Sequence, residues 1–88
     1  MEIKFTRNFK KRYKKAPKDI QKAFNRRLAL FEKNNFHPAL RNHALQGKYR
    51  NYRSVNITGD WRAIFKQNGK DSGLVIFAIL GTHSELYK

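Results

Sequence analysis

The sequence contains no cysteine, so neither a disulfide nor a thiolate metal site can form in it. This absence fits the reducing cytosol, and we expect a cytoplasmic protein. Long hydrophobic runs are also missing: the longest, Leu74 to Leu80, is far shorter than the ~20 residues that a membrane-spanning helix needs. The first residues, Met1 to Lys4, carry no apolar signal region. We therefore expect a soluble protein.

Acidic side chains are scarce. The 88 residues hold 6 Asp and Glu against 20 Lys and Arg, a formal net charge of +14, and the excess lies almost wholly in residues 1–53, whose net charge is +13. Such a field attracts polyanions, which makes nucleic acid the natural partner and an anionic membrane or an acidic protein the alternatives. A hydrophobic fraction of 40% with 14% aromatics supports a packed core, so we expect one domain over residues 1–88 rather than a disordered basic tail.

Several catalytic signatures are absent from the sequence. It has no Walker loop, no dinucleotide-binding glycine fingerprint, no His-Glu-x-x-His and no nucleophile elbow. The three histidines and six acidic residues do not follow the spacing of metal ligands. These absences favour a reaction that needs neither a metal nor a cofactor.

The first half of the chain predicts a strand and two helices. Apolar and polar residues alternate over residues 1–5, as in a short strand. Thr6 suits the cap of a helix in which Phe9 and Tyr13, four residues apart, share one face. Pro17 suits the first turn of a second helix that reaches about Asn34. Its apolar residues recur at steps of three and four: Ile20, Phe24, Leu28 and Phe31.

Asn34 and Asn35 indicate a left-handed stop to this helix. The segment from Phe36 to Asn51 shows little periodicity and is predicted to be a connector, long for so small a domain.

The second half predicts three antiparallel strands. Residues 52–65 alternate around a turn at Thr58-Gly59-Asp60, with Val55 and Ile57 on one face of the first arm. In the second arm Trp61, Ala63 and Phe65 share a face, and Arg62, Ile64 and Lys66 take the other. Residues 67–73 have turn composition, and Leu74–Leu80 is apolar throughout, as in a central strand covered on both faces. We therefore predict an α+β fold, β-α-α-β-β-β, with a helical hairpin packed on a small twisted antiparallel sheet.

Five residues could converge on one rim of this sheet and form a catalytic site: His43, Asp60, Arg62, His83 and Tyr87. Metal-free RNA cleavage needs a base for the 2′-hydroxyl proton, a cation for the phosphorane charge and an acid for the leaving 5′-oxygen. Histidine can be the acid or the base, and arginine binds phosphate oxygens bidentately. A structural interpretation exists for each residue taken alone: Arg62 could pair with Asp60 or Glu85, and His83 could cap the last turn.

Basic and aromatic residues alternate before the hairpin, a mixture that suits phosphate contacts and base stacking. The residues that we expect to contact RNA are Lys48, Arg50, Arg53, Trp61 and Ser84. A tryptophan in this position is more often an anchor of the core, and that interpretation of Trp61 stays open beside the RNA contact.

Three segments resemble the RelE/ParE toxin superfamily, and within it the YafQ-like RelE/StbE toxins. They are His43-Ala44-Leu45-Gln46-Gly47, the run from Tyr52 through Gly59-Asp60-Trp61-Arg62 to Phe65, and Gly81-Thr82-His83-Ser84-Glu85-Leu86-Tyr87. The resemblance implies a fold like that of the microbial ribonucleases and the toxin component of a type II toxin-antitoxin system. It further implies a metal-independent mRNA interferase whose partners are mRNA in the A site of the 70S ribosome and an antitoxin with an acidic contact surface, with no membrane partner.

The resemblance also implies roles for single residues. His43, Asp60 and His83 match the acid/base group, with His83 the leading general acid and the base either His43 or Asp60. Arg62 matches the arginine on the scissile phosphate, and Tyr87 the aromatic residue that orients a substrate base. The chain departs from some relatives at Asn56, where they carry histidine, and at Ile79, where they carry arginine. The alternative functions are a non-catalytic ParE-like inhibitor of DNA gyrase and a basic RNA- or ribosome-binding module.

Overall fold

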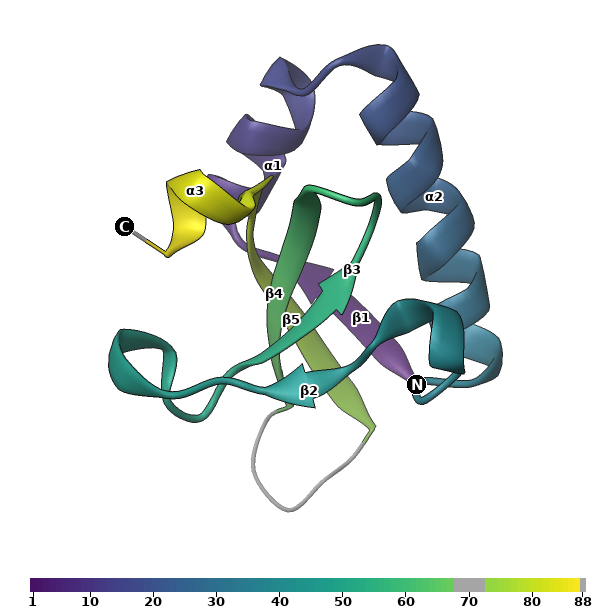
Figure 1. The fold of residues 1–88 in the computed structure, drawn as a ribbon. Coiled ribbons are helices and arrows are strands. Elements are labelled where there is room, and N and C mark those ends of the chain that lie inside the picture. Colours follow the sequence, from purple (N-terminus) through teal and green to yellow (C-terminus); the bar gives the residue numbers. More distant parts are fainter. Residues whose placement is uncertain (68–72, 88) are drawn as a thin grey trace.

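Helices cover one face of a five-stranded sheet in the computed structural model, which describes residues 1–67 and 73–87 (Figure 1). The sheet order is β1-β5-β4-β3-β2. The elements in chain order are β1 (Glu2–Phe5), α1 (Arg7–Lys15), α2 (Lys18–Lys33), the 3-10 turn η1 (Pro38–Leu40), β2 (His43–Ala44), the 3-10 turn η2 (Gly47–Tyr49), β3 (Arg53–Asn56), β4 (Trp61–Gln67), β5 (Leu74–Thr82) and α3 (His83–Leu86). The predicted α+β class and the helical hairpin on a sheet are confirmed. In the described part of the chain, no helix is long and apolar enough to cross a membrane.

The helical hairpin begins where the sequence predicts. The Thr6 hydroxyl accepts a hydrogen bond from the Phe9 amide (3.1 Å) and donates one to the Ala78 carbonyl (2.7 Å), which ties the start of α1 to β5. Pro17 immediately precedes α2, and the Gln21 amide group donates to the Tyr13 carbonyl at 2.7 Å across the corner between the helices. A single hydroxyl, that of Thr6, thus caps α1 and attaches its start to the sheet.

The predicted left-handed stop at Asn34 and Asn35 is wrong. Asn34 has φ −158° and ψ 100°, an extended conformation, and the described non-glycine residues with positive φ are Arg41 and Asn51. The side-chain oxygen of Asn34 accepts from the Phe36 amide (3.1 Å), so the side chain itself closes the turn. A left-handed residue is therefore not required there.

The connector over residues 36–51 is more ordered than predicted. It contains both 3-10 turns and the edge strand β2, which pairs antiparallel with β3 through His43 opposite Ser54 and Ala44 opposite Arg53. A strand of two residues is too short to show alternation, and its pairing is set by β3 rather than by its own composition.

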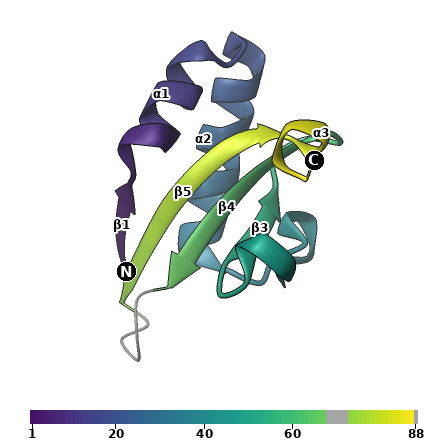
Figure 2. The same cartoon turned by 90° about the vertical axis from the view of Figure 1, so that its left-hand side faces the viewer.

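The sheet is mixed, and here the prediction of a wholly antiparallel sheet is wrong. β1 pairs in parallel with β5, from Glu2 opposite Leu74 to Phe5 opposite Phe77. These two strands lie near opposite ends of the sequence, so the chain between them is long enough for the crossover connection that parallel strands need. The β3-β4-β5 meander is antiparallel as predicted, and β5 lies inside the sheet, between β1 and β4 (Figure 2). Residues 68–72 of the predicted turn lie outside the described residues.

Hairpin alternation is confirmed on the face that the helices cover: Val55, Ile57, Ala63 and Phe65 all belong to the main core. The other face of β5 is covered less than predicted, because Ile76, Ala78 and Ile79 are only half-buried.

Phe77 is the centre of the core. Its ring contacts five other phenylalanines with centroid distances from 5.4 to 5.8 Å: Phe5, Phe9, Phe24, Phe31 and Phe65. Because these five come from β1, α1, α2 and β4, one side chain on β5 joins the helical layer to the sheet.

Truncation of this ring is expected to destabilise the whole domain. Phe77→Ala removes a ring that is 1% exposed and should cost about 3–5 kcal/mol in the free energy of unfolding, which chemical denaturation followed by far-UV circular dichroism measures. The control Phe36→Ala removes a ring of the same size that is 64% exposed and should cost less than about 1 kcal/mol. Equal losses in the two variants would contradict the central place of Phe77.

Candidate nucleolytic cleft

A cleft of about 620 Å³ lies on the face of the sheet away from α1 and α2, where β2, β3, β4 and α3 meet. Its lining contains four of the five residues predicted to be catalytic. The lining residues are Arg41, Asn42, His43, Leu45, Asn56, Arg62, His83 and Tyr87. Residues separated by up to 46 positions in the sequence therefore share one cavity.

His43 enters the cleft from the edge strand β2. Its ring Nδ1 lies 2.7 Å from the Arg41 carbonyl oxygen. A carbonyl can only accept, so Nδ1 carries the hydrogen and Nε2 carries the lone pair. The imidazole is thus held in the tautomer that can take up a proton at Nε2.

Arg62 is fixed by the hairpin turn that precedes it. It lies opposite Asn56 on β3 and Gly81 on β5. Its Nη1 donates to three carbonyl oxygens, those of Thr58, Gly59 and Trp61, each at 3.1 Å. Within the described residues, Nε and Nη2 have no such partner and remain for a ligand. A guanidinium with one nitrogen anchored in this way is preorganised to bind phosphate oxygens.

His83 and Tyr87 are held by the short helix α3. Thr82 and Glu85 form a capping box at its start, and the His83 amide donates to the Asp60 carbonyl at 2.9 Å. The rings of His83 and Tyr87 are in contact at 4.8 Å between centroids, tilted by 53°, and Tyr87 in turn meets Tyr49 edge-on at 6.1 Å. The last helix therefore presents an imidazole backed by an aromatic ring.

Gly81 permits the close approach of α1 to this helix. A Cβ atom at Gly81 would lie 2.9 Å from the Arg12 Nη1 and 3.3 Å from the Glu85 Oε1. A larger residue at Gly81 would displace the tip of the Arg12 side chain, whose guanidinium bonds the Leu80 carbonyl (3.2 Å) beside Glu85 (3.9 Å). The end of β5 is thereby locked to α1 directly before His83.

Asp60 and Trp61 lie outside the cleft. Asp60 is exposed on the turn, and its carboxylate is absent from the lining, although its carbonyl holds the His83 amide. Trp61 points to the opposite face of β4, towards α1, as consecutive strand residues do. The roles predicted for these two residues stay predictions.

The remaining predicted RNA contacts are not among the residues that line the cleft. Lys48 lies 5.1 Å above the Tyr49 ring, Arg50 is exposed after η2, and Ser84 is exposed beside His83. Arg53 is engaged internally: its Nε donates to the Asn42 side-chain oxygen at 2.7 Å.

Asn42 was missed by sequence reasoning. Its amide donates to the Asn35 carbonyl (3.0 Å) while its oxygen accepts from Arg53, so it fixes the segment that carries His43. Its position next to His43 is the only signal of this role in the sequence.

The charge of the cleft is positive. Arg41 and Arg62 line it, and no acidic side chain is among the lining residues. Among the described residues there is also no group of three or more His, Asp or Glu side chains that could hold a metal ion. Two imidazoles, fixed cations and an aromatic ring can bind a phosphodiester and transfer protons around it.

One family model matches the whole chain. The family model described as "Bacterial toxin of type II toxin-antitoxin system, YafQ" matches residues 1–88. The crystal structure of YafQ from E. coli strain BL21(DE3) superposes with a TM-score of 0.81 at 25% identity, covering 99% of this chain and 98% of that one. YafQ in the E. coli DinJ-YafQ toxin-antitoxin complex has a TM-score of 0.65 at 25% identity, covering 99% and 97%.

A YoeB/ParE toxin from Agrobacterium tumefaciens shares the fold, with a TM-score of 0.77 at 16% identity over 94% of this chain and 99% of that one. A search of the curated proteins found no match. The match of the family model over the full length confirms the resemblance seen in the sequence: the chain belongs to the YafQ family of bacterial toxins of type II toxin-antitoxin systems.

Proposed function

We propose that this chain is a metal-independent endoribonuclease that cuts mRNA in the A site of the 70S ribosome, and so acts in the cytoplasm. The observation that carries the proposal is that His43, Arg62 and His83, from three separate elements, line one cleft. A gyrase inhibitor or a plain RNA-binding module has no need of two imidazoles around a fixed guanidinium. Membership of a toxin family supports an activity that harms the cell.

His43 is the general base of the proposed reaction. Its Nε2 has the lone pair, because Nδ1 donates to the Arg41 carbonyl. Nε2 accepts the proton of the RNA 2′-hydroxyl, and the 2′-oxygen then attacks the adjacent phosphorus. Asp60, the alternative base in the sequence, is less well supported because its carboxylate lies outside the cleft lining.

Arg62 and His83 act on the other side of the phosphate. Arg62 places Nε and Nη2 against the non-bridging oxygens, where negative charge grows in the phosphorane. His83 donates a proton to the leaving 5′-oxygen, and the Tyr87 ring in contact with it orients a neighbouring base. The products are a 2′,3′-cyclic phosphate and a free 5′-hydroxyl.

We also propose a protein partner, an antitoxin with an acidic contact surface. E. coli YafQ is found in complex with DinJ, and this chain carries a net charge of +14 that an acidic partner would neutralise.

The first test is cleavage of mRNA on ribosomes. His83→Ala should lower the cleavage rate by about 10²–10⁴-fold, because the leaving oxygen loses its proton donor. Arg62→Lys keeps the charge but loses the fork, and should lower the rate at least about tenfold. Primer extension on a translated message measures both. A zinc-selective chelator, which leaves Mg²⁺ for the ribosome, should have no effect.

The matched control is His37→Ala. His37 is the remaining histidine, its Nδ1 accepts from the Ala39 amide, and it is not among the cleft residues. This variant should cut at about the wild-type rate. Circular dichroism must show that all variants fold. Full cleavage by folded His83→Ala and Arg62→Lys would overturn the assignment, and inhibition of gyrase supercoiling by the wild-type protein would favour the ParE-like alternative.

A second test concerns the nucleophile. A message with a single 2′-deoxynucleotide on the 5′ side of the cut bond lacks the attacking oxygen and should remain intact at that bond, while the unmodified message is cut there. Cleavage of the modified bond would point to attack by water instead of the 2′-hydroxyl.

The antitoxin can be sought directly. The product of the neighbouring open reading frame, co-expressed with this chain, should co-purify with it and block cleavage, and the complex should weaken as salt rises. A neighbour that neither binds nor inhibits would count against the proposed partner.

A further inference from the structure

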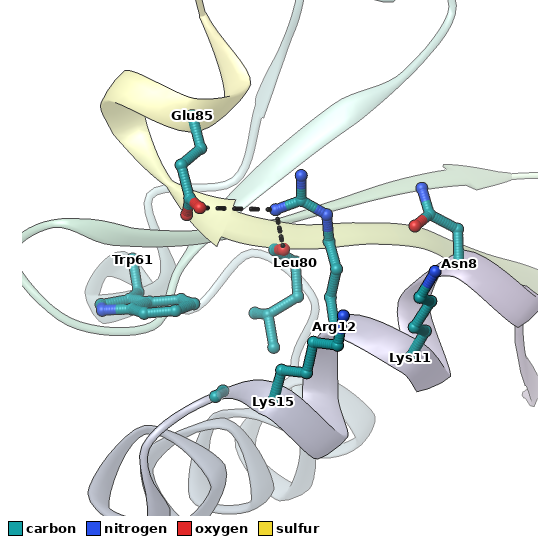
Figure 3. Close-up of a pocket in the computed structure, with 8 residues that line it drawn as sticks. Asn8, Lys11, Arg12, Lys15, Trp61, Leu80 and Glu85 are labelled. Carbon is teal, nitrogen blue, oxygen red and sulfur yellow. Dashed lines mark hydrogen bonds and ion pairs between the residues drawn. The ribbon is translucent and has the colours of Figure 1, made fainter.

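A second groove, of about 420 Å³, opens on the helix side of the sheet between α1 and the ends of β4 and β5 (Figure 3). Basic residues of α1 lie on one side of it and the indole of Trp61 on the other. In Figure 3, Trp61 and Lys11 lie on either side of Leu80 and the Arg12 guanidinium. None of the residues proposed to act on the scissile phosphate lines this groove.

The groove has an excess of positive charge. Glu85 is paired with Arg12 at 3.9 Å, so it offsets the one guanidinium. Lys11 and Lys15 are exposed and form no ion pair with a described residue. They lie four residues apart on one face of α1, where like charges repel each other and destabilise a helix. This repulsion brings no structural gain, and a bound anion would relieve it.

Trp61 adds a planar apolar surface to this charge. Its side chain is half-buried: part of it packs against the core, and part faces the groove. Lysines beside an exposed aromatic face are the combination that binds single-stranded nucleic acid: the cations bind phosphates, and a base stacks on the ring. An acidic peptide would use the lysines but would leave the indole without a planar partner.

The position of the groove also fits RNA. Trp61 and Arg62 are neighbours in β4, and their side chains project to opposite faces of the same strand end. One face thus carries the groove and the other carries the cleft proposed to cut RNA, so both can meet RNA at the same end of the molecule.

We propose that this groove is a second binding site, for an unpaired RNA nucleotide whose base stacks on Trp61 and whose phosphates bind Lys11 and Lys15. The RNA is either a flanking part of the message or a segment of ribosomal RNA. The proposal rests on the proposed function only for the source of the RNA, since the binding itself requires no cleavage.

Trp61 is the single tryptophan of the chain, so its fluorescence reports on the groove alone. The probe is a hexamer of 2′-O-methyladenosine, which cannot be cut by 2′-hydroxyl attack. It should quench the fluorescence of the wild-type protein. The double variant Lys11→Ala/Lys15→Ala should bind at least about tenfold more weakly and lower the slope of log affinity against log salt by about 1.4, as expected for two lost phosphate contacts.

The matched control is Lys10→Ala/Lys14→Ala, which removes the same charge from the same helix. These lysines line a different, apolar hollow between α1 and α2 and should change the affinity less than about threefold. Equal weakening in both double variants would reduce the effect to the overall charge and overturn the proposal. Failure of the hexamer to quench would overturn it too, as would quenching by hexaglutamate alone, which would assign the groove to an acidic protein.

Cross-linking separates the two sources of RNA. A photoreactive benzoylphenylalanine in place of Asn8, an exposed residue of the lining that makes none of the proposed contacts, is placed on ribosomes that carry a labelled message. It should cross-link either to the message or to ribosomal RNA, and each result supports the proposal for that source. Cross-links to ribosomal protein alone would contradict it. If the hexamer quenches the fluorescence but the protein does not cut mRNA, the RNA-binding groove is supported and the proposed nuclease activity is overturned. If the protein cuts mRNA but the hexamer does not quench, the nuclease activity is supported and the groove proposal is overturned.

Discussion

The packing of Phe77 against rings from four other elements is the constraint on which the remaining structure depends. The hairpin of α1 and α2 has little stability of its own, because its many positive charges repel one another. Burial of Phe9, Phe24 and Phe31 against Phe77 offsets this repulsion and holds the helices on the sheet. Because β5 also leads directly into α3, the same contact sets where His83 lies relative to Arg62.

Local periodicity correctly predicted the elements whose structure depends mainly on residues close together in the sequence. The apolar stripe of α2, the Thr6 cap and the alternating arms of the hairpin all follow from side chains within a few positions of one another. The edge strand β2 and the parallel pairing of β1 did not follow, because both are decided by partners far away in the sequence. Asn34 shows a different limit: asparagine can end a helix with its backbone or with its side chain, and composition does not distinguish the two.

Much the same division holds for the candidate site. The predicted group of His43, Arg62, His83 and Tyr87 does share a cavity. The hairpin and β5 carry Arg62, His83 and Tyr87 to one end of the sheet, and the pairing of β2 with β3 adds His43. Asp60 and Trp61 directly precede Arg62 in the sequence, yet one is on an exposed turn and the other faces α1. Residues that are close together in a sequence motif therefore lie at the same end of a strand. Because successive side chains of a strand point to opposite faces, such residues can still belong to two different sites. What Asn42 does could not be inferred, because both of its hydrogen-bond partners come from other elements.

The four residues of α3 would not form a stable helix by themselves, because one turn makes too few hydrogen bonds to offset the conformational entropy lost on nucleation. Three contacts stabilise it: the Thr82–Glu85 capping box, the hydrogen bond to the Asp60 carbonyl and the burial of Leu86. Release of this C-terminal segment is accordingly a sub-global opening that needs far less free energy than denaturation of the domain. A substitution at one of these tethers can misplace His83 while the melting temperature hardly moves, so in this protein thermal stability is a poor measure of whether the cleft that His83 lines is assembled.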